Sequence, residues 1–413
     1  MREDTGAAAV AELQGLDGSF SFAERLLQRI WERGEFDRTR AVTADGRAIR
    51  ILNPGLWNSR GGPDFRQARL EIGGVRVSGD VELHLRAADW TAHGHAADAN
   101  YDGVVLHVVL FPAANVFTEG AHGRNIPVLS LLSLLYRSLE EYADDEAVER
   151  LANHPLARAQ ETLLKLTRAD QLLELRRGAA ERWATKVSFA ARRAERLGWT
   201  EACHQTALEI LGYRFNRCPM LALAMEHPLT DWPEIGSGDR LTRLEAEFAD
   251  RWNRQAVRPA NHPRTRIRQY ALWTERVRNW PDRLARYGVE FAGCADGATE
   301  TAEFRKRCAL ADLWSRLAED VCGGAVGGTR FRTLVCDGFL PLLAAREPAR
   351  SADFRLYWFH GYAGDIPENI SRILSALQLT SGAKNPLNHG LAQGLLSWCW
   401  RDEMRKQQTT ACP

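Results

Sequence analysis

The chain of 413 residues carries 54 lysine and arginine side chains against 53 aspartate and glutamate side chains, a formal net charge of +1. Ordinary domains have about 100–150 residues, so this length predicts two domains, each large enough to bury its own core. The balanced charge by itself indicates neither a nucleic-acid nor a membrane partner. No run approaches the roughly 20 apolar residues that span a bilayer, and the first residues lack the apolar core of a secretory signal. We therefore expect a cytoplasmic protein.

The first 130 residues predict a compact α/β unit. Residues 1–18 are expected to form a mobile tail, and a helix is expected to start at Ser21, because Ser21 and Glu24 form a capping-box pattern. Three runs bounded by Gly, Pro and Asn predict strands over 47–53, 64–72 and 75–86. They are followed by a helix or long turn over 87–101, a buried strand over 103–111 and a short strand near 126–131. The predicted nuclease-like core of residues 19–130 thus has the order helix, three strands, helix, strand.

From residue 131 to residue 413 the sequence shows helical periodicity, with Leu, Ala, Glu and Arg dominating. We expect a large, mainly α-helical region, either one domain or two sub-domains divided near residues 225–265. The glycine-rich stretch 322–328 does not match a phosphate-binding loop, because no Lys-Ser or Lys-Thr step follows it, and it predicts a flexible connection.

The strand over residues 75–86 places Glu82 and His84 on one polar face, because side chains alternate between the two faces of a strand. A two-residue turn at Gly73-Gly74 would turn Asp64, on the preceding strand, to the opposite face. A one-residue bulge would bring Asp64 opposite His84 and beside Glu82, and Gly79 is the expected place for it. The group is then either a catalytic site or the solvated polar face of a surface hairpin.

The sequence resembles two known families. A first helix bearing Glu24, a Pro-Asp step at Asp64 and the Glu82-x-His84 step resemble the PD-(D/E)XK nuclease superfamily over about residues 20–112, and the order of elements agrees with its restriction-endonuclease-like core. The chain as a whole, with "ERLLQRIW", "GPDF", "GDVELH" and "LGYRFNRCPM", also resembles an uncharacterised bacterial family of the domain-of-unknown-function type.

The nuclease resemblance implies that Asp64 and Glu82 bind Mg²⁺ or Mn²⁺, which would activate a water and neutralise charge on a phosphodiester. The chain departs from that pattern at His84, which stands where the superfamily has a lysine. The similar very-short-patch repair nucleases also use histidines, so His84 would orient or deprotonate the attacking water. Glu24 would be an outer ligand, or simply the carboxylate of a capping box.

Further histidines follow the polar strand. His93 and His95 could contact phosphate or transfer protons, but they do not share a face if residues 87–101 form a helix. In an extended turn they would. His107, inside an apolar strand, is expected to be a hydrogen-bonded core residue.

An arginine-rich segment in the helical part predicts contact with nucleic acid. Residues 251–286 contain ten arginines, and Arg258, Arg264, Arg266 and Arg268 are the candidate phosphate contacts. Aromatic residues are interleaved with them and could stack on bases. They are equally well explained as the core of a helix with a solvated arginine face.

The sequence therefore predicts a metal-dependent phosphodiesterase, a nuclease with DNA as its expected substrate. The alternatives are a non-catalytic module that binds nucleic acid or protein on a degenerate nuclease scaffold, and a structural or assembly protein.

Overall fold

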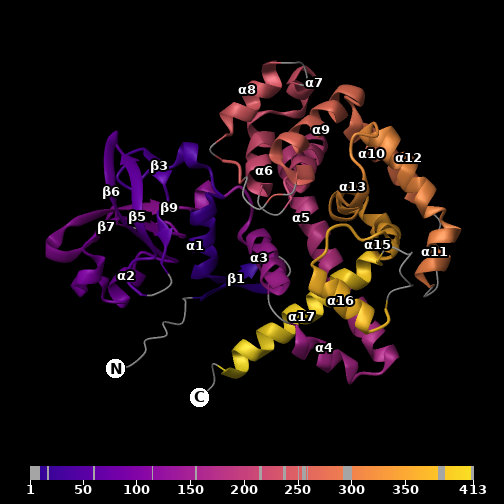
Figure 1. Ribbon diagram of the computed structural model, residues 1–413, viewed down its shortest axis with the longest axis horizontal. Helices are drawn as coiled ribbons and strands as arrows, with labels where there is room; N and C mark the ends of the chain where they lie inside the picture. Colours follow the sequence, from indigo (N-terminus) through magenta and orange to yellow (C-terminus); the bar gives the residue numbers. More distant parts are fainter. Residues whose placement is uncertain are drawn as a thin grey trace. The chain divides into compact units, whose positions relative to one another are not determined.

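The computed structural model describes residues 10–15, 18–58, 61–113, 115–153, 156–213, 216–235, 239–249, 251–253, 257, 259–291, 300–379 and 387–410. The chain folds into two compact units, Met1–Glu146 and Ala147–Pro413 (Figure 1). None of the helices in the described part of the chain is long and apolar enough to cross a bilayer.

The first unit begins with an antiparallel pair of strands, β1 (Val10–Gly15) and β2 (Gly18–Ala23). Residues 1–9, 16 and 17 of the expected tail lie outside the described residues, whereas Val10–Gly15 is paired along its length. Helix α1 (Glu24–Arg33) follows directly, with Ala23 as an N-cap that makes no side-chain hydrogen bond. The expected capping box at Ser21 is wrong, because pairing with β1 keeps the backbone extended through Ala23.

A mixed sheet occupies the centre of this unit. Its strands are β3 (Ile49–Asn53), β4 (Leu56–Trp57), β5 (Phe65–Ile72), β6 (Val75–His84), β7 (Val104–Val109), β8 (Phe117–Glu119) and β9 (Asn125–Ser130). Within the described residues the order is β3-β5-β6-β7-β9-β8, with β4 paired to β5. The β6–β7 and β7–β9 pairs are parallel, and the other pairs are antiparallel. The expected α/β unit is confirmed, and β4 and β8 are additions at its edges.

The hairpin of β5 and β6 contains a one-residue bulge, but the bulge lies on β5. The register shifts between Phe65 and Ala68, where two residues of β5 lie opposite Asp80. One of them, Gln67, has a left-handed backbone with φ of 59°. Its N–H donates to Oδ1 of Asp80 at 3.0 Å, which holds this conformation in place.

The prediction of a bulge at Gly79 is therefore wrong. Gly79 instead lies in close contact with strand β7. A Cβ atom at Gly79 would lie 2.3 Å from Cγ1 of Val105 and 2.6 Å from the carbonyl oxygen of Gly103. Because glycine has no Cβ atom, strand β7 can approach β6 closely at the start of the β6–β7 pairing.

The segment after β6 is not one helix over 87–101. It contains the single turn α2 (Asp89–Ala92) and two short 3-10 turns at His95–Ala97 and Ala99–Tyr101. Gly94, with φ of 73°, reverses the chain between them. This left-handed glycine ends the first turn of helix, as glycine commonly does.

The second unit is helical. Its elements are α3 (Leu139–Asn153, which begins in the first unit), α4 (Ala157–Leu164), α5 (Arg168–Leu211), α6 (Arg217–Glu226), α7 (Trp232–Ile235), α8 (Asp239–Glu247), α9 (Pro263–Arg276), α10 (Trp280–Tyr287), α11 (Thr301–Arg307), α12 (Leu310–Cys322), α13 (Gly328–Thr333), α14 (Leu340–Arg346), α15 (Ser351–His360), α16 (Glu368–Ala376) and α17 (His389–Thr410). A π-helical stretch, Leu334–Phe339, joins α13 to α14.

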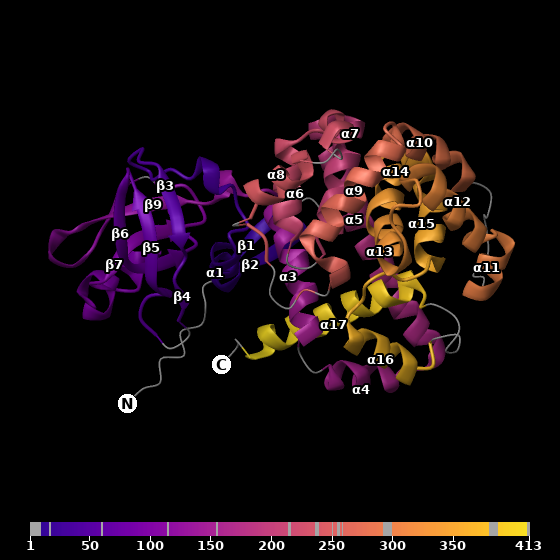
Figure 2. The ribbon, with the colours of Figure 1, turned by 45° about the horizontal axis from the view of Figure 1, so that its top comes forward.

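Helices α5 and α17 pack closely in this unit (Figure 2). A Cβ atom at Gly178 would lie 2.8 Å from the carbonyl oxygen of Gly394, so small residues permit this contact. Gly198 interrupts α5 with non-helical backbone angles. The glycine-rich stretch 322–328 connects α12 to α13, as the sequence predicts.

Candidate metal centre

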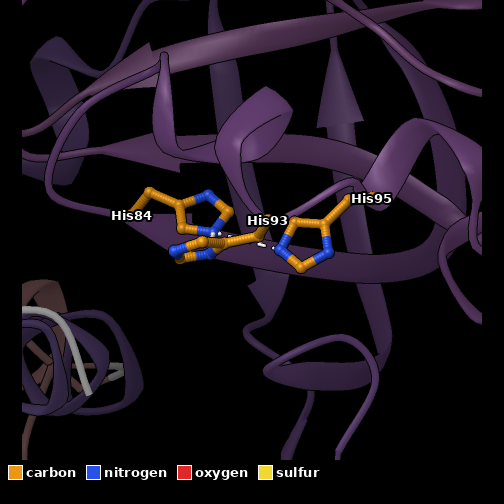
Figure 3. Close-up of side chains that lie close together, drawn as sticks. All are labelled: His84, His93 and His95. Atoms are coloured by element: carbon orange, nitrogen blue, oxygen red, sulfur yellow. Dashed lines mark hydrogen bonds between the residues drawn. The ribbon is translucent and has the colours of Figure 1, made fainter. Parts of the chain in front are cut away.

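Three histidines from two elements meet in the first unit. His84 ends β6, while His93 and His95 lie on either side of Gly94. Figure 3 shows the three rings gathered around a common point. The reversal at Gly94 decides this arrangement, because His93 and His95 would diverge on a regular helix. Each ring offers one nitrogen, and the three nitrogens lie within 4.8 Å of one another.

The spacing of these nitrogens suits a first-row transition metal. Nε2 of His84 lies 3.2 Å from Nδ1 of His93 and 3.2 Å from Nε2 of His95. Two ligands about 2.0–2.1 Å from a tetrahedral metal are themselves about 3.3–3.4 Å apart. Both separations from His84 are close to that value. His84 and His95 are buried and His93 is exposed, so the cluster opens on one side.

Glu82 adjoins the histidines from the same face of β6. Its Oε1 lies 3.5 Å from Nε2 of His84 and 3.4 Å from Nε2 of His95. Glu82 is only 4% exposed and His84 only 1%. The alternative of a solvated polar strand face therefore does not hold.

Asp64 meets Glu82 but not the histidine cluster. The bulge on β5 lets the backbone N–H of Asp64 donate to Oε2 of Glu82 at 3.0 Å. Both oxygens of Asp64 accept hydrogen bonds, Oδ1 from Gln28 of α1 at 2.7 Å and Oδ2 from the N–H of Leu83 at 3.0 Å. Asp64 thus orients Glu82, and its own carboxylate is already held by protein donors.

A second layer of side chains fixes His84. Its Nδ1 lies 2.9 Å from Nε2 of His107, and Nδ1 of His107 lies 2.7 Å from Oγ1 of Thr118. If Nε2 of His84 binds a metal, its Nδ1 carries the proton and donates to His107, which in turn donates to Thr118. Metal-binding histidines are commonly oriented by such chains. His107 is fully buried and hydrogen-bonded, as expected from the sequence.

The electrostatics of the cluster favour a bound cation. Burial raises the pKa of Glu82, and the neighbouring Asp64 raises it further. Burial also raises the pKa of Asp64. The pKa of His84 is lowered to about 2, first by burial and then by His107 and the other histidines. The imidazoles are therefore neutral and have lone pairs to donate, and the buried carboxyls resist ionisation. A bound metal ion would accept these lone pairs and would favour the ionised form of the carboxyls.

Glu24 lies on α1 at the edge of this cluster. Burial, Asp64 and Asp89 together raise its pKa to about 8, and its Oε2 is buried without a hydrogen-bond partner among the described residues. It does not cap α1, and it is not one of the side chains that converge at the histidine cluster.

The donor set differs from the one that the nuclease resemblance implies. Mg²⁺ prefers oxygen ligands, whereas imidazole suits zinc, iron, nickel and copper. Three imidazole nitrogens converge here, and the oxygens of Asp64 are engaged elsewhere. The residues present fit a transition metal better than Mg²⁺.

The arginines expected to contact nucleic acid lie in the second unit. Arg258 lies outside the described residues. Arg266 is 6% exposed and bonds Asn261 and Gln269, and burial lowers its pKa to about 10. Arg264 and Arg268 are half-exposed and pair with the same carboxylate, that of Glu245.

The aromatic residues of that segment are mostly core residues. Tyr270, Trp273 and Trp280 are fully buried, and Trp252 is 9% exposed. Buried rings have no free face for a base, so the helix-core explanation holds for these four residues.

The sequence did not predict that Gln28 and Thr118 would support this cluster. Both are far from β6 in sequence, and neither belongs to a short motif. Gln28 follows Glu24 by four residues, and this spacing was the one indication that Gln28 lies on the same face of α1 as Glu24.

The chain thus joins an α/β unit with a buried histidine and carboxylate cluster to a helical unit. A model of the family described as "Protein of unknown function (DUF2851)" matches residues 24–246, more than half of the 413 residues. The protein belongs to this family. The matched range includes every residue of the cluster. No curated protein and no solved structure matches the chain.

Proposed function

We propose that this protein is a metal-dependent phosphodiesterase acting on DNA, with its centre at His84, His93, His95 and Glu82. The convergence of three imidazole nitrogens beside a buried carboxylate carries the proposal. Catalytic zinc sites commonly have three protein ligands and leave one position open for water. The exposed side at His93 supplies such an opening.

The bound metal and the side chains of the protein would make different contributions to the reaction. A bound transition metal would lower the pKa of its water and offset charge on the phosphate. With the cation bound beside it, Glu82 would be ionised and would be the base that accepts the proton of this water, since its Oε1 lies 3.4–3.5 Å from the histidine nitrogens. The water oxygen would bond to phosphorus as the bond to the leaving oxygen breaks, and Glu82 would return its proton to that leaving oxygen. Asp64 holds Glu82 through its backbone N–H, and His107 holds His84.

Separate variants test metal binding and chemistry. We expect the purified chain to bind one transition metal, and His93→Ala to lose both metal and cleavage of single- or double-stranded DNA. Glu82→Gln should keep the metal and lose activity by about 10²–10⁴-fold, the usual contribution of a general base. The control is His122→Asn, at an exposed position outside the histidine cluster whose left-handed backbone asparagine tolerates.

Metal content by mass spectrometry and cleavage in Zn²⁺, Mn²⁺, Fe²⁺ and Mg²⁺ are the measurements, with RNA as a comparison substrate. Cleavage at the wild-type rate by both His93→Ala and Glu82→Gln would overturn the proposal.

A second candidate is a nucleic-acid-binding module with a structural metal. The position of Asp64 favours it, because its carboxylate accepts hydrogen bonds from Gln28 and Leu83 and is not among the groups that converge for metal binding. Metal binding together with salt-sensitive DNA binding and no cleavage in any of the four metals would select this candidate.

A further inference from the structure

One face of strand β6 leads from solvent to the metal centre. Side chains alternate regularly along β6, because the register shift of the β5–β6 pair lies on β5 and that of the β6–β7 pair lies on β7. Arg76, Ser78, Glu82 and His84 therefore share one face of the strand. Glu82 and His84 are buried at the metal centre, whereas Arg76 and Ser78 are exposed.

Arginines occupy the open end of this face. Arg50 of β3 lies opposite Glu71 of β5, and Glu71 lies opposite Arg76 of β6, so the three side chains share the face. Arg69, two residues before Glu71, shares it as well. Leu70 between them is fully buried on the other face, and the three arginines are exposed. Strands β3, β5 and β6 are neighbours in the sheet (Figure 1), so these arginines form one group.

A fourth arginine, Arg66, lies between this group and the metal centre. Phe65, the residue before it, lies opposite Val81, and both are fully buried on the other face of the sheet. Arg66 therefore points to the face of Glu82, which follows Val81. Leu56, opposite Arg66 on β4, is 68% exposed, so this part of the face is open to solvent.

The guanidinium groups keep most of their donors free. Arg50 and Arg69 make no hydrogen bond or ion pair within the described part of the chain. Nη2 of Arg66 donates to the carbonyl oxygen of Gly61 at 3.4 Å. This bond is long and exposed, and a guanidinium has five N–H groups, so the other four remain available to a ligand.

Two carboxylates share the face without neutralising it. Oε2 of Glu71 lies 3.9 Å from Nε of Arg76, whose side chain is 81% exposed, and ion pairs at the surface are weak. Oδ1 of Asp80 accepts the N–H of Gln67. Four arginines against two carboxylates leave an excess of positive charge, which suits a polyanion.

The length of the face suits a DNA duplex. Arg76 and Glu82 are six residues apart on β6, about 20 Å at 3.4 Å per residue. Successive phosphates of one DNA strand rise by about the same distance, so the face spans about six base pairs. Proteins that bind single strands stack bases on aromatic rings, and no aromatic residue points outward from the described strands β3, β5 and β6 on this face.

We infer that the arginine face, defined as Arg50, Arg66, Arg69 and Arg76, binds the phosphate backbone of double-stranded DNA on one side of the bond that is cleaved. The position of that bond rests on the proposed phosphodiesterase function, whereas binding to the arginines needs no cleavage. Contacts to phosphate carry no sequence information, so the face adds affinity and orients the duplex along β6.

Fluorescence anisotropy of a labelled DNA duplex, longer than about six base pairs, tests this inference. The full chain carries Glu82→Gln, so that the DNA stays intact. We expect Arg66→Gln, Arg69→Gln and Arg76→Gln together to weaken binding by about tenfold or more at about 100 mM salt. The plot of log affinity against log salt should become shallower by about 0.9 for each arginine removed.

The matched control is Arg372→Gln on α16, an arginine whose side chain is 74% exposed and pairs with Glu368. It should change neither the affinity nor the salt dependence. Thermal melts show whether each variant is folded.

Kinetics with the native Glu82 give a second measurement. The three arginine substitutions should raise KM and leave kcat unchanged, because phosphate contacts away from the cleaved bond hold substrate and transition state alike. The wild-type KM should also rise when fewer than about six base pairs remain on one side of the cleaved bond.

Unchanged affinity and salt dependence in the folded triple variant would overturn the arginine face. Tighter binding of poly-glutamate than of DNA would also overturn it, in favour of an acidic protein partner. Arginine-dependent binding without any cleavage would overturn the phosphodiesterase alone, so the two failures are distinguishable.

Discussion

His84 is the central residue of the proposed metal centre. Its Nε2 faces His93 and His95, and its Nδ1 is bonded to His107. A histidine with both nitrogens engaged in this way has a fixed ring orientation.

Substitution of Thr118 tests the chain of bonds behind His84. Thr118→Val removes the acceptor for Nδ1–H of His107, and we expect metal affinity to fall by about 10–100-fold, as for other outer partners of metal ligands. Competition with a chelator measures this. Thr242→Val, at an exposed position of α8, is the control. Equal metal affinity in the two variants would show that His107 does not orient His84.

A partly buried ion pair in the helical unit gives a prediction about pH. Burial alone would raise the pKa of Asp337, but Lys186, 2.8 Å away, and His389 outweigh burial and lower it to about 2. The folded pKa lies below the ordinary value of 3.8, so this carboxylate adds stability above about pH 4. That contribution is lost as the pH falls through the folded pKa of about 2.

Lys186→Met leaves the partly buried carboxylate without its main cation, and we expect a loss of about 1–3 kcal/mol in unfolding free energy at pH 7. The difference from wild type should shrink between pH 4 and pH 2 in denaturant titrations, since protonated Asp337 no longer needs the cation. Lys165→Met, at an exposed position, should show neither effect. A difference that stays constant over this pH range would contradict the assignment.

At the scale of elements, the β5–β6 hairpin decides whether the carboxylates meet. A flat hairpin would turn Asp64 away, and the bulge at Gln67 turns it toward Glu82. The sequence showed that one extra residue was needed. It did not show which strand carries it, because a glycine in a strand signals either a bulge or a close contact.

Gly79→Ala tests the close contact with β7. The added methyl would collide with Val105 and with the carbonyl of Gly103, so we expect a loss of about 1–3 kcal/mol in unfolding free energy. Gly327→Ala, where the added atom meets nothing within 4 Å, should change it by less than about 0.5 kcal/mol. Chemical denaturation compares the two. Similar effects at both positions would mean that crowding at Gly79 is not what constrains it.

At the scale of the whole molecule, the candidate metal ligands all belong to the first unit, Met1–Glu146. A ligand that binds only the folded state stabilises it by about 4 kcal/mol at a thousandfold excess over its dissociation constant. We expect Zn²⁺ or Mn²⁺ to raise the unfolding temperature of this unit and a chelator to lower it.

Scanning calorimetry with and without metal measures this shift, with His93→Ala as the variant that should not respond. The same thermal shift in wild type and His93→Ala would place the metal elsewhere.

The sequence by itself determined the class of fold and the set of candidate side chains. Alternation along β6 placed Glu82 and His84 on one face, and helical periodicity identified the second unit, because both patterns are local and depend only on backbone geometry. The same patterns could not separate a solvated face from a buried one, which depends on what packs against it.

Tertiary structure alone decided which of these side chains meet. The left-handed turn at Gly94, the bulge on β5 and the buried His107–Thr118 pair bring together residues from distant parts of the chain. Their chemistry follows from that convergence, since the identity of the donor atoms determines which cation they can hold only when burial and spacing bring those atoms together.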